Sequence, residues 1–436
     1  MSEQSGARKA GIGRRDFLIA AAAAAVSSAG SRARAMPAND RLNIGILGAG
    51  GRGRANTEAV AEGNRIAALC DVNRQALDAA AERYPGARPY RDYRRMLEAR
   101  RDLDALVIST PDHSHALPIL MALDLGLHVY CEKALTHSVW EARQVRQAVA
   151  AKPELATQMG IQIQAGANYR RVVELIRGGA IGAVREAHVW TIRVKGGGQR
   201  PEPPEPVPEH LDWDLWLGVA PRRPFHSDYL GRPGWYQFWD FGGGTLTDMG
   251  SHWNDLPFWA LQLEAPRRIQ ASGPPVHPET APAELVVRFE FAARGECPPV
   301  TLHWSHGQPR PVDYQGPELP AGWNNGILFV GEHGQVLADY TRHVLLPEDR
   351  FADFQRPEPW LEESPGHQAE WVRACKGGPD TLADFEYSGR LTEMNHLGNI
   401  AYRIGQPIEW DAAALQTNVP AANELLRRPY REGWGD

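Results

Sequence analysis

The chain has 436 residues, of which 43% are hydrophobic and 23% charged, and its formal net charge is −6. This composition is typical of a folded protein with a sizeable core and two or three domains, and it excludes low-complexity disorder. The acidic balance argues against a nucleic-acid-binding protein. No apolar run reaches about 18 residues without a charge or a Ser/Gly break, so the sequence predicts no membrane-spanning helix.

Residues 1–35 have the features of an export signal. Arg14-Arg15 precedes a short apolar stretch, Leu18 to Val26, and the small-residue motif Ala33-Arg34-Ala35 follows. These parts are typical of a secretory signal peptide, and the arginine pair indicates the twin-arginine type. The segment holds six basic and two acidic residues, so its removal takes the net charge from −6 to −10. We predict a periplasmic or exported protein; an N-terminal helix of the mature fold is the alternative.

From residue 42 to residue 160, strand-like and helix-like segments alternate. Strands are predicted at Leu42–Leu47, Arg65–Cys70, Ala105–Ser109, Leu127–Cys131 and Ala156–Gly160. Helices are predicted at Arg54–Glu62, Arg74–Arg83, His115–Leu125 and Trp140–Val149. Such alternation predicts βαβ units and a parallel sheet, so residues 42–160 form an α/β domain of the Rossmann type.

Residues 161–436 follow another pattern. A helix at Tyr169–Arg177 and a strand at Val184–Val194 precede a Gly/Pro-rich loop over residues 196–208. Further strands are predicted at Leu285–Phe291, Val300–Trp304, Gly326–Val330 and Val336–Asp339, and helices at Trp253–Gln262, Gly366–Cys375 and Phe385–Ile404. Strands among separate helices predict an α+β domain with a mostly antiparallel open sheet. We expect this domain to bind substrate and to form the interface of a homodimer or homotetramer.

The four cysteines are predicted to be free thiols. Cys70 and Cys131 each end a strand-like apolar run, where cysteine usually acts as a small buried hydrophobic residue. Neither these two nor Cys297 and Cys375 form a CxxC motif.

A dinucleotide site is indicated by Gly48-Ala49-Gly50-Gly51-Arg52-Gly53, a G-x-G-x-x-G motif between a strand and a helix. Asp71 ends the next strand, 18 residues after Gly53. The glycines Gly48, Gly50, Gly51 and Gly53 let backbone N–H groups approach a pyrophosphate, and Asp71 accepts hydrogen bonds from the adenosine ribose. The negative charge of Asp71 would repel the 2′-phosphate of NADP and therefore favours NAD. Arg74 is near in sequence and could bind that phosphate, so NADP is the alternative cofactor.

Three further motifs follow in chain order. They are Thr110-Pro111-Asp112-His113-Ser114-His115, then Cys131-Glu132-Lys133-Ala134-Leu135, then Gly242-Gly243-Gly244-Thr245-Leu246-Thr247-Asp248-Met249-Gly250-Ser251-His252-Trp253-Asn254-Asp255. After a dinucleotide fingerprint, this series resembles the glucose–fructose oxidoreductase / inositol dehydrogenase (Gfo/Idh/MocA) family over residues 42–410. The stretches Leu211–Gly218 and Phe329–Glu332 resemble its exported branch. Ala134 stands where the family usually has proline.

The resemblance implies that Lys133 is the catalytic lysine and that Asp248 and His252 are the substrate-side acid and base. It also implies that Thr110, Pro111, His115 and Glu132 contact the cofactor together with Lys133 and the loop residue Arg52. The residue chemistry agrees, because oxidation of an alcohol needs a base for the hydroxyl proton and a cation near the developing negative charge on oxygen. Asp248 and His252 have i, i+4 spacing, which places them on one helical face.

Each assignment has a structural alternative. Asp248 could be a residue that caps the helix start, His252 a core histidine and Lys133 a loop cation. His113 and His115 form an H-x-H pair, but we predict no metal centre. Four aromatic residues near the catalytic run would either stack on a sugar or pack a loop: Trp213, Trp216, Trp235 and Trp239.

These observations predict an NAD(P)-dependent oxidoreductase that acts on a hydroxyl of a sugar, polyol or glycoside. Outside the cytoplasm no free NAD pool is at hand, so an exported enzyme needs a tightly bound cofactor that is reduced and reoxidised in place. The alternative is an NAD-dependent, redox-neutral glycoside hydrolase, which oxidises transiently, eliminates the aglycone, adds water and reduces again. The expected partner is a small-molecule carbohydrate, not a nucleic acid or a membrane.

Overall fold

The computed structural model describes residues 41–231 and 233–434. The predicted signal peptide, with Arg14-Arg15 and the Ala33-Arg34-Ala35 motif, lies outside these residues. Within the described part of the chain, none of the helices is both long and apolar enough to cross a bilayer. The four cysteines carry no disulfide, as predicted.

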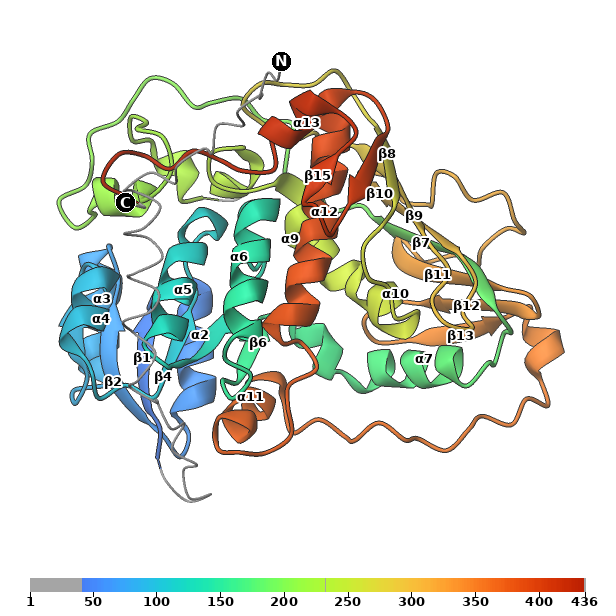
Figure 1. Cartoon of the computed structure of the whole chain (residues 1–436), viewed down its shortest axis with the longest axis horizontal. Helices are drawn as coiled ribbons and strands as arrows, with labels where there is room; N and C mark the ends of the chain where they lie inside the picture. Colours follow the sequence, from blue (N-terminus) through green and yellow to red (C-terminus); the bar gives the residue numbers. More distant parts are fainter. Residues whose placement is uncertain (1–40, 232, 435–436) are drawn as a thin grey trace, which may run out of the picture. The chain divides into compact units, whose positions relative to one another are not determined.

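The first domain is built on a six-stranded parallel sheet of order β3-β2-β1-β4-β5-β6 (Figure 1). Its strands are β1 Asn43–Leu47, β2 Arg65–Cys70, β3 Arg88–Tyr90, β4 Ala105–Ile108, β5 His128–Cys131 and β6 Thr157–Met159. Its helices are α2 Gly51–Ala61, α3 Arg74–Arg83, α4 Tyr93–Ala99, α5 Ala116–Asp124 and α6 Val139–Ala150. The strand order reverses at β1, and the carboxyl ends of strands at such a point form a ligand crevice.

Both faces of the first sheet are buried, so its central strands are continuous apolar runs that can be recognised in the sequence. Every residue of β4 is buried, and its alternate side chains join two different core clusters. The short edge strand β3 was not predicted, because its three residues are exposed or half-buried and include a proline. The helix α4 was likewise missed.

The second domain contains a nine-stranded sheet of order β13-β12-β11-β7-β10-β9-β8-β14-β15. The strands are β7 Val184–Thr191, β8 Arg268–Ser272, β9 Leu285–Phe291, β10 Val300–His306, β11 Asn325–Gly331, β12 Gly334–Ala338, β13 His343–Leu346, β14 Ile408–Asp411 and β15 Gln416–Thr417. All paired strands are antiparallel except β7 and β10, so the predicted mostly antiparallel sheet is confirmed.

The α-helices of this second part are α7 Ala167–Arg177, α8 Trp213–Leu217, α9 Gly244–Trp253, α10 Asp255–Ala260, α11 His367–Cys375, α12 Phe385–Ile404 and α13 Pro420–Glu424. Short 3-10 helices are η1 Asp112–Ser114, η2 Gln162–Ala165, η3 Ser227–Tyr229, η4 Gly234–Gln237 and η5 Glu348–Phe351. The predicted helix Trp253–Gln262 was wrong in extent. Two helices, α9 and α10, replace it. Helix α9 begins at Gly244, the last residue of a glycine run, so no capping residue marks its start in the sequence.

Helix α12 connects the two domains. It packs on α6 of the first domain and on α9, β8 and β9 of the second, and Figure 1 shows it running between α6 and the second sheet. At the α6–α12 contact the buried Glu393 carboxylate accepts hydrogen bonds from Arg143 and Arg146, at 2.9–3.0 Å. Glu386, which also binds Arg146, is more exposed.

We predict that Glu393→Gln destabilises the protein by about 1.5–3 kcal/mol, because the half-buried guanidinium groups of Arg143 and Arg146 lose charge-assisted hydrogen bonds to a buried carboxylate. The matched control Glu386→Gln removes an exposed carboxylate of the same network and should cost about 1 kcal/mol or less. Urea unfolding followed by tryptophan fluorescence measures both. Equal effects of the two variants would contradict this account of the domain contact.

Candidate active site

The glycine loop between β1 and α2 has the backbone that its sequence predicts. Gly48 has φ +83° and Gly51 has φ +50°, a region that favours glycine. A Cβ on Gly53 would lie 1.7 Å from the Gly48 carbonyl oxygen, so only glycine fits there. Arg52 is exposed at the first turn of α2. The loop therefore has the compact form that a pyrophosphate site requires.

Asp71 lies at the end of β2 and faces the glycine loop. Its Oδ2 atom accepts hydrogen bonds from the Ala49 N–H, at 2.8 Å, and the Gly50 N–H, at 3.3 Å. Its Oδ1 atom accepts from the Asn73 N–H at 2.8 Å. Burial raises the pKa of Asp71, and these three backbone hydrogen bonds act against that rise. Asp71, the residue predicted to bind the ribose, is thus held directly against the loop predicted to bind the pyrophosphate.

His115 is fully buried between two loops at the carboxyl edge of the sheet. Its Nδ1 atom lies 2.7 Å from the Ala134 carbonyl oxygen and its Nε2 atom 2.7 Å from that of Thr110. His115 was expected to line the nicotinamide pocket. Through these two contacts its ring links the Thr110 carbonyl to that of Ala134, next to Lys133. Its neighbour His113 contacts the Trp216 carbonyl oxygen at 2.9 Å through Nε2.

Glu132 is buried in a network of side-chain amides. Its Oε1 atom accepts hydrogen bonds from Asn56 Nδ2, at 3.0 Å, and from Gln162 Nε2, at 2.9 Å. A Cβ on Gly160 would lie 2.7 Å from this carboxylate, so the backbone there also approaches closely. Asn56 and Gln162 were not predicted, because amides in helices α2 and η2 carry no sequence signal that separates them from surface polar residues.

Lys133, Asp248 and Lys195 form the centre of the candidate site. The Asp248 carboxylate is 1% exposed, and its Oδ1 atom accepts from the Lys133 ammonium while its Oδ2 atom lies 2.7 Å from Lys195 Nζ. The Lys133–Ala134 peptide is cis. Burial lowers the pKa of the Lys133 ammonium. The buried Asp248 carboxylate thus lies between two lysine side chains.

Lys195 and Tyr236 are the functional candidates that sequence reasoning missed. Lys195 lies between the end of β7 and the Gly/Pro-rich loop, and its Nζ atom lies 3.5 Å from the centre of the Tyr236 ring. Its backbone N–H donates to Thr245 Oγ1 of α9 at 2.8 Å. Only the tertiary fold brings this loop to Asp248, so no spacing in the sequence could have indicated it.

His252 lies one helical turn after Asp248 on α9, as the i, i+4 spacing predicts. Its Nδ1 atom is buried and has no hydrogen-bond partner among the described residues. Burial and the nearby Lys133 ammonium hold the pKa of His252 well below the ordinary 6.5. The imidazole is therefore neutral at physiological pH, with a buried Nδ1 atom that has no hydrogen-bond partner among the described residues.

The four tryptophans divide into two groups. Trp213 and Trp216 stack at 4.5 Å inside a buried aromatic cluster, so packing explains them. Trp239 is also buried. Trp235 remains half-buried and stacks on Tyr236 at 3.8 Å, beside Lys195. Among these four, Trp235 alone combines partial exposure with a stacking contact to Tyr236, the ring that lies against Lys195.

The arrangement of glycine loop, Asp71 and lysine–aspartate centre is that of a dinucleotide-binding oxidoreductase. Two family models match the chain: the Gfo/Idh/MocA oxidoreductase family, NAD-binding Rossmann fold, over residues 42–159, and the C-terminal alpha/beta domain of the same family over residues 177–296. The chain belongs to the Gfo/Idh/MocA oxidoreductase family, and residues 42–159 have the NAD-binding Rossmann fold of that family.

Among curated proteins, the chain is 30% identical over 148 residues to an inositol 2-dehydrogenase of Rubrobacter xylanophilus, covering 33% of this chain and 42% of that protein. It is 26% identical over 365 residues to an uncharacterized oxidoreductase, YrbE, of Bacillus subtilis, covering 80% and 92%. The alignment with the inositol dehydrogenase thus spans less than half of that relative.

Among solved structures, the fold is similar to the WlbA dehydrogenase from Bordetella pertussis, in complex with NADH and UDP-GlcNAcA. The TM-score is 0.60 at 19% identity, over 86% of this chain and 99% of that one. It is also similar to GenD2 from gentamicin A biosynthesis, in complex with NAD, with a TM-score of 0.58 at 19% identity over 86% and 97%. These similarities extend through both domains.

We predict that Asp71→Asn weakens NAD binding by about 1.5–3 kcal/mol, or roughly 10- to 150-fold, because charge-assisted hydrogen bonds are lost. Equilibrium dialysis of the purified chain against NAD measures the change. Asp78→Asn, an exposed position on α3, is the matched control and should leave affinity unchanged. Unaltered affinity in Asp71→Asn would show that the ribose contact is elsewhere.

Proposed function

We propose that this chain is an NAD(H)-dependent oxidoreductase that acts on a hydroxyl of a sugar, polyol or glycoside and retains its cofactor through the catalytic cycle. The observation that carries the proposal is the Lys133–Asp248–Lys195 centre beside the neutral His252. The printed names of the relatives, an inositol 2-dehydrogenase and a dehydrogenase bound to a sugar nucleotide, support a polyhydroxylated substrate.

The described residues fit NAD. The loop at Gly48 to Gly53 admits no side chain at its closest approach, so a pyrophosphate could lie close to the first turn of α2. Asp71 would hold the adenosine ribose, and its negative charge disfavours the 2′-phosphate of NADP. Thr110, Pro111 and Glu132 would lie along the nicotinamide half. When bound, NAD accepts a hydride from the carbon that carries the hydroxyl.

The chain's own residues handle the proton and the charge. The neutral His252 takes the hydroxyl proton at Nδ1, and the Lys133 ammonium stabilises the negative charge that develops on the oxygen. Asp248 orients Lys133 and prevents two adjacent ammonium groups from repelling each other. The half-buried Trp235–Tyr236 pair presents an apolar face to the ring of the substrate.

Cofactor retention is supported by a segment that we name the strap, residues 210–219 including α8. It is joined to the end of β2, where Arg74 N–H donates to the His210 carbonyl at 2.7 Å and Asp212 N–H donates to that of Val72 at 3.0 Å. A mostly apolar cavity lies beside it, lined by Trp216 of the strap, by Val72, Thr110 and Pro111, by residues of α4 and α5 and by Trp434 near the C-terminus. The strap therefore lies against the end of β2, where Asp71 would hold the adenosine ribose.

The C-terminal segment holds the strap in place. Arg431 is largely buried, and it donates to the Gly218 carbonyl through Nε at 3.0 Å and to the Asp214 carbonyl through Nη2 at 2.9 Å. It also pairs with the Asp214 carboxylate, and its backbone N–H donates to the Val219 carbonyl at 3.0 Å. Opening the crevice requires all of these bonds to break, which slows cofactor release.

A retained cofactor favours a redox-neutral cycle, in which each hydride taken is returned in the same site. One form oxidises one sugar and reduces another; the second is the redox-neutral glycoside hydrolase. The strap and the predicted twin-arginine signal are the observations that favour such a cycle. The proposal includes an exported location and a homo-oligomer.

The function is tested on the purified chain with no NAD added. Mass spectrometry of the heat-denatured protein should detect NAD(H), and a panel of aldoses, inositols and aryl glycosides should reveal turnover. Turnover that requires an acceptor sugar or ketone identifies the oxidoreductase. Aglycone release without an acceptor, with solvent deuterium entering next to the oxidised carbon, identifies the hydrolase. Absence of NAD(P) from the protein contradicts both.

In that assay, Lys133→Ala and His252→Ala should each lower turnover by about 10²–10⁴ while bound NAD(H) stays unchanged. Because the pKa of His252 lies below 6.5, the base form persists as the pH falls through 6.5, and kcat/KM should decline only at lower pH. Near wild-type turnover in either variant would remove that residue from the mechanism.

A separate prediction tests the strap. Arg431→Ala should raise the rate of NAD release about tenfold or more, because charge-assisted bonds to the strap are lost. Arg222 contacts the same Asp214 carboxylate at 3.2 Å but is 79% exposed, so Arg222→Ala should change the rate only slightly. Stopped-flow displacement of bound NADH gives both rates, and equal rates would show that the strap does not retain the cofactor.

A further inference from the structure

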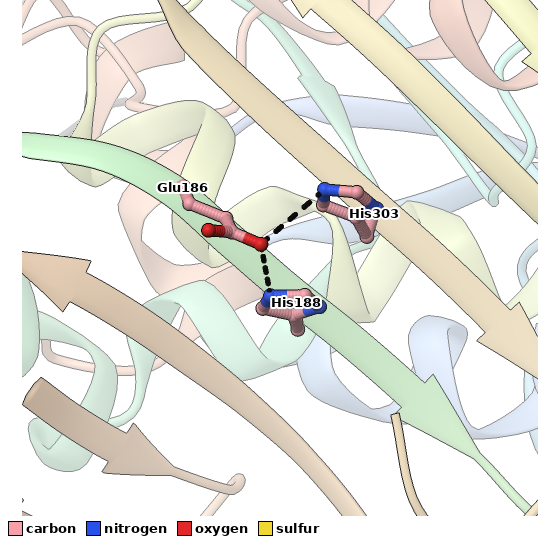
Figure 2. Close-up of side chains that lie close together, drawn as sticks. All are labelled: Glu186, His188 and His303. Atoms are coloured by element: carbon pink, nitrogen blue, oxygen red, sulfur yellow. Dashed lines mark hydrogen bonds and ion pairs between the residues drawn. The ribbon is translucent and has the colours of Figure 1, made fainter. Parts of the chain in front are cut away.

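A second group of functional side chains lies on the nine-stranded sheet, outside the candidate active site. Strands β7 and β10 run parallel, and their register places His303 directly beside His188. Glu186 is two residues before His188 and therefore shares its face of the sheet. Figure 2 shows the three side chains converging between the two strands, with the Glu186 carboxylate directed toward both rings.

The distances between these side chains suit a metal ion. Glu186 Oε1 lies 2.8 Å from His188 Nε2 and 3.6 Å from His303 Nε2. The potential ligand atoms all lie within 4.8 Å of one another. Ligands of a tetrahedral Zn²⁺, each at about 2.0–2.2 Å, are about 3.3–3.6 Å apart, so small side-chain rotations suffice.

The charge state also suits a cation. Among the described residues, no Lys or Arg forms an ion pair with Glu186; its ion-pair partners are the two imidazoles. The His188 ring is 1% exposed, and an unprotonated imidazole is the form that binds metals.

A neighbouring carboxylate orients one of the two rings. Asp313 Oδ2 lies 3.3 Å from His303 Nδ1, which favours a proton on Nδ1 and leaves the Nε2 lone pair directed toward Glu186. Metal-binding histidines commonly hydrogen-bond a carboxylate through their other nitrogen in this way. Tyr314, the next residue after Asp313, contacts the His188 ring at 5.3 Å between centroids.

We propose that Glu186, His188 and His303 form a zinc site with three protein ligands and an open fourth position for water. Two imidazoles and one carboxylate are a set that Zn²⁺ accepts in proteins. The site is independent of the dehydrogenase centre, because the alternating residues Ala187 and Val189 belong to the core cluster shared with the helices, on the other face. Bound zinc would fix His303 and, through Asp313, the segment between β10 and β11.

The test uses the full chain purified without an affinity tag, stripped with a chelator and then equilibrated with Zn²⁺. Elemental analysis after desalting should find about one zinc per chain, and Co²⁺ in its place should give the intense visible absorption of a four-coordinate site. Glu186→Gln and His303→Gln should each weaken zinc binding by more than about 100-fold, and Asp313→Asn by about 10- to 100-fold. The exposed His333→Gln is the matched control and should bind zinc like the wild type.

Two results would overturn the proposal. One is a wild-type chain that, after equilibration with Zn²⁺ and desalting, retains no more zinc than a sample of His333→Gln that was stripped of metal and given no zinc. The other is a folded Glu186→Gln or His303→Gln variant, checked by circular dichroism, that retains as much zinc as the wild type. Because the wild-type stoichiometry and the Co²⁺ spectrum need no variant, a failure of the variants to fold does not prevent the test.

Discussion

The buried carboxylate of Asp248 is the constraint on which the candidate site depends. A charge that is 1% exposed persists in a protein interior only when it is paired and hydrogen-bonded, and here Lys133 and Lys195 supply both. The three residues come from the loop after β5, the loop after β7 and helix α9. Pairing them therefore closes the second domain over the carboxyl edge of the first sheet.

The packing around α9 keeps this carboxylate in position. Asn399 of α12 donates to the Gly243 carbonyl at 2.7 Å, just before α9, and Asn254 at its end donates to Asn395 of α12 at 2.9 Å. Helix α12 also carries Glu393, the buried partner of the α6 arginines. One helix thus fixes both the domain contact and the two ends of α9, so Asp248 and His252 lie on a helix that is held at both ends.

Segments that connect strands contribute to both proposed sites, the cofactor crevice and the outer face of the second sheet. Residues 210–219 fold back across the end of β2, where backbone hydrogen bonds and Arg431 hold them. The segment after β10 folds onto the outer face of the second sheet, where Asp313 and Tyr314 reach the two stacked histidines. Both segments look like plain loops in sequence, and both carry the residues that complete a proposed site.

The sequence by itself determined the α/β domain with its glycine loop and Asp71, because strand, turn and helix there are local and a tight turn admits only glycine. It also placed Asp248 and His252 on one helical face, since a spacing of four is a local property of a helix. Only the tertiary structure decided which side chains meet: Lys195 with Asp248, Asn56 with Glu132, and Glu186 with His303. These contacts join segments far apart in the chain, and they depend on strand order, register and the path of long loops, which no short-range pattern encodes. For the same reason the sequence does not show that both ring nitrogens of His115 contact backbone carbonyl oxygens, or that Trp213 and Trp216 lie in a buried aromatic cluster.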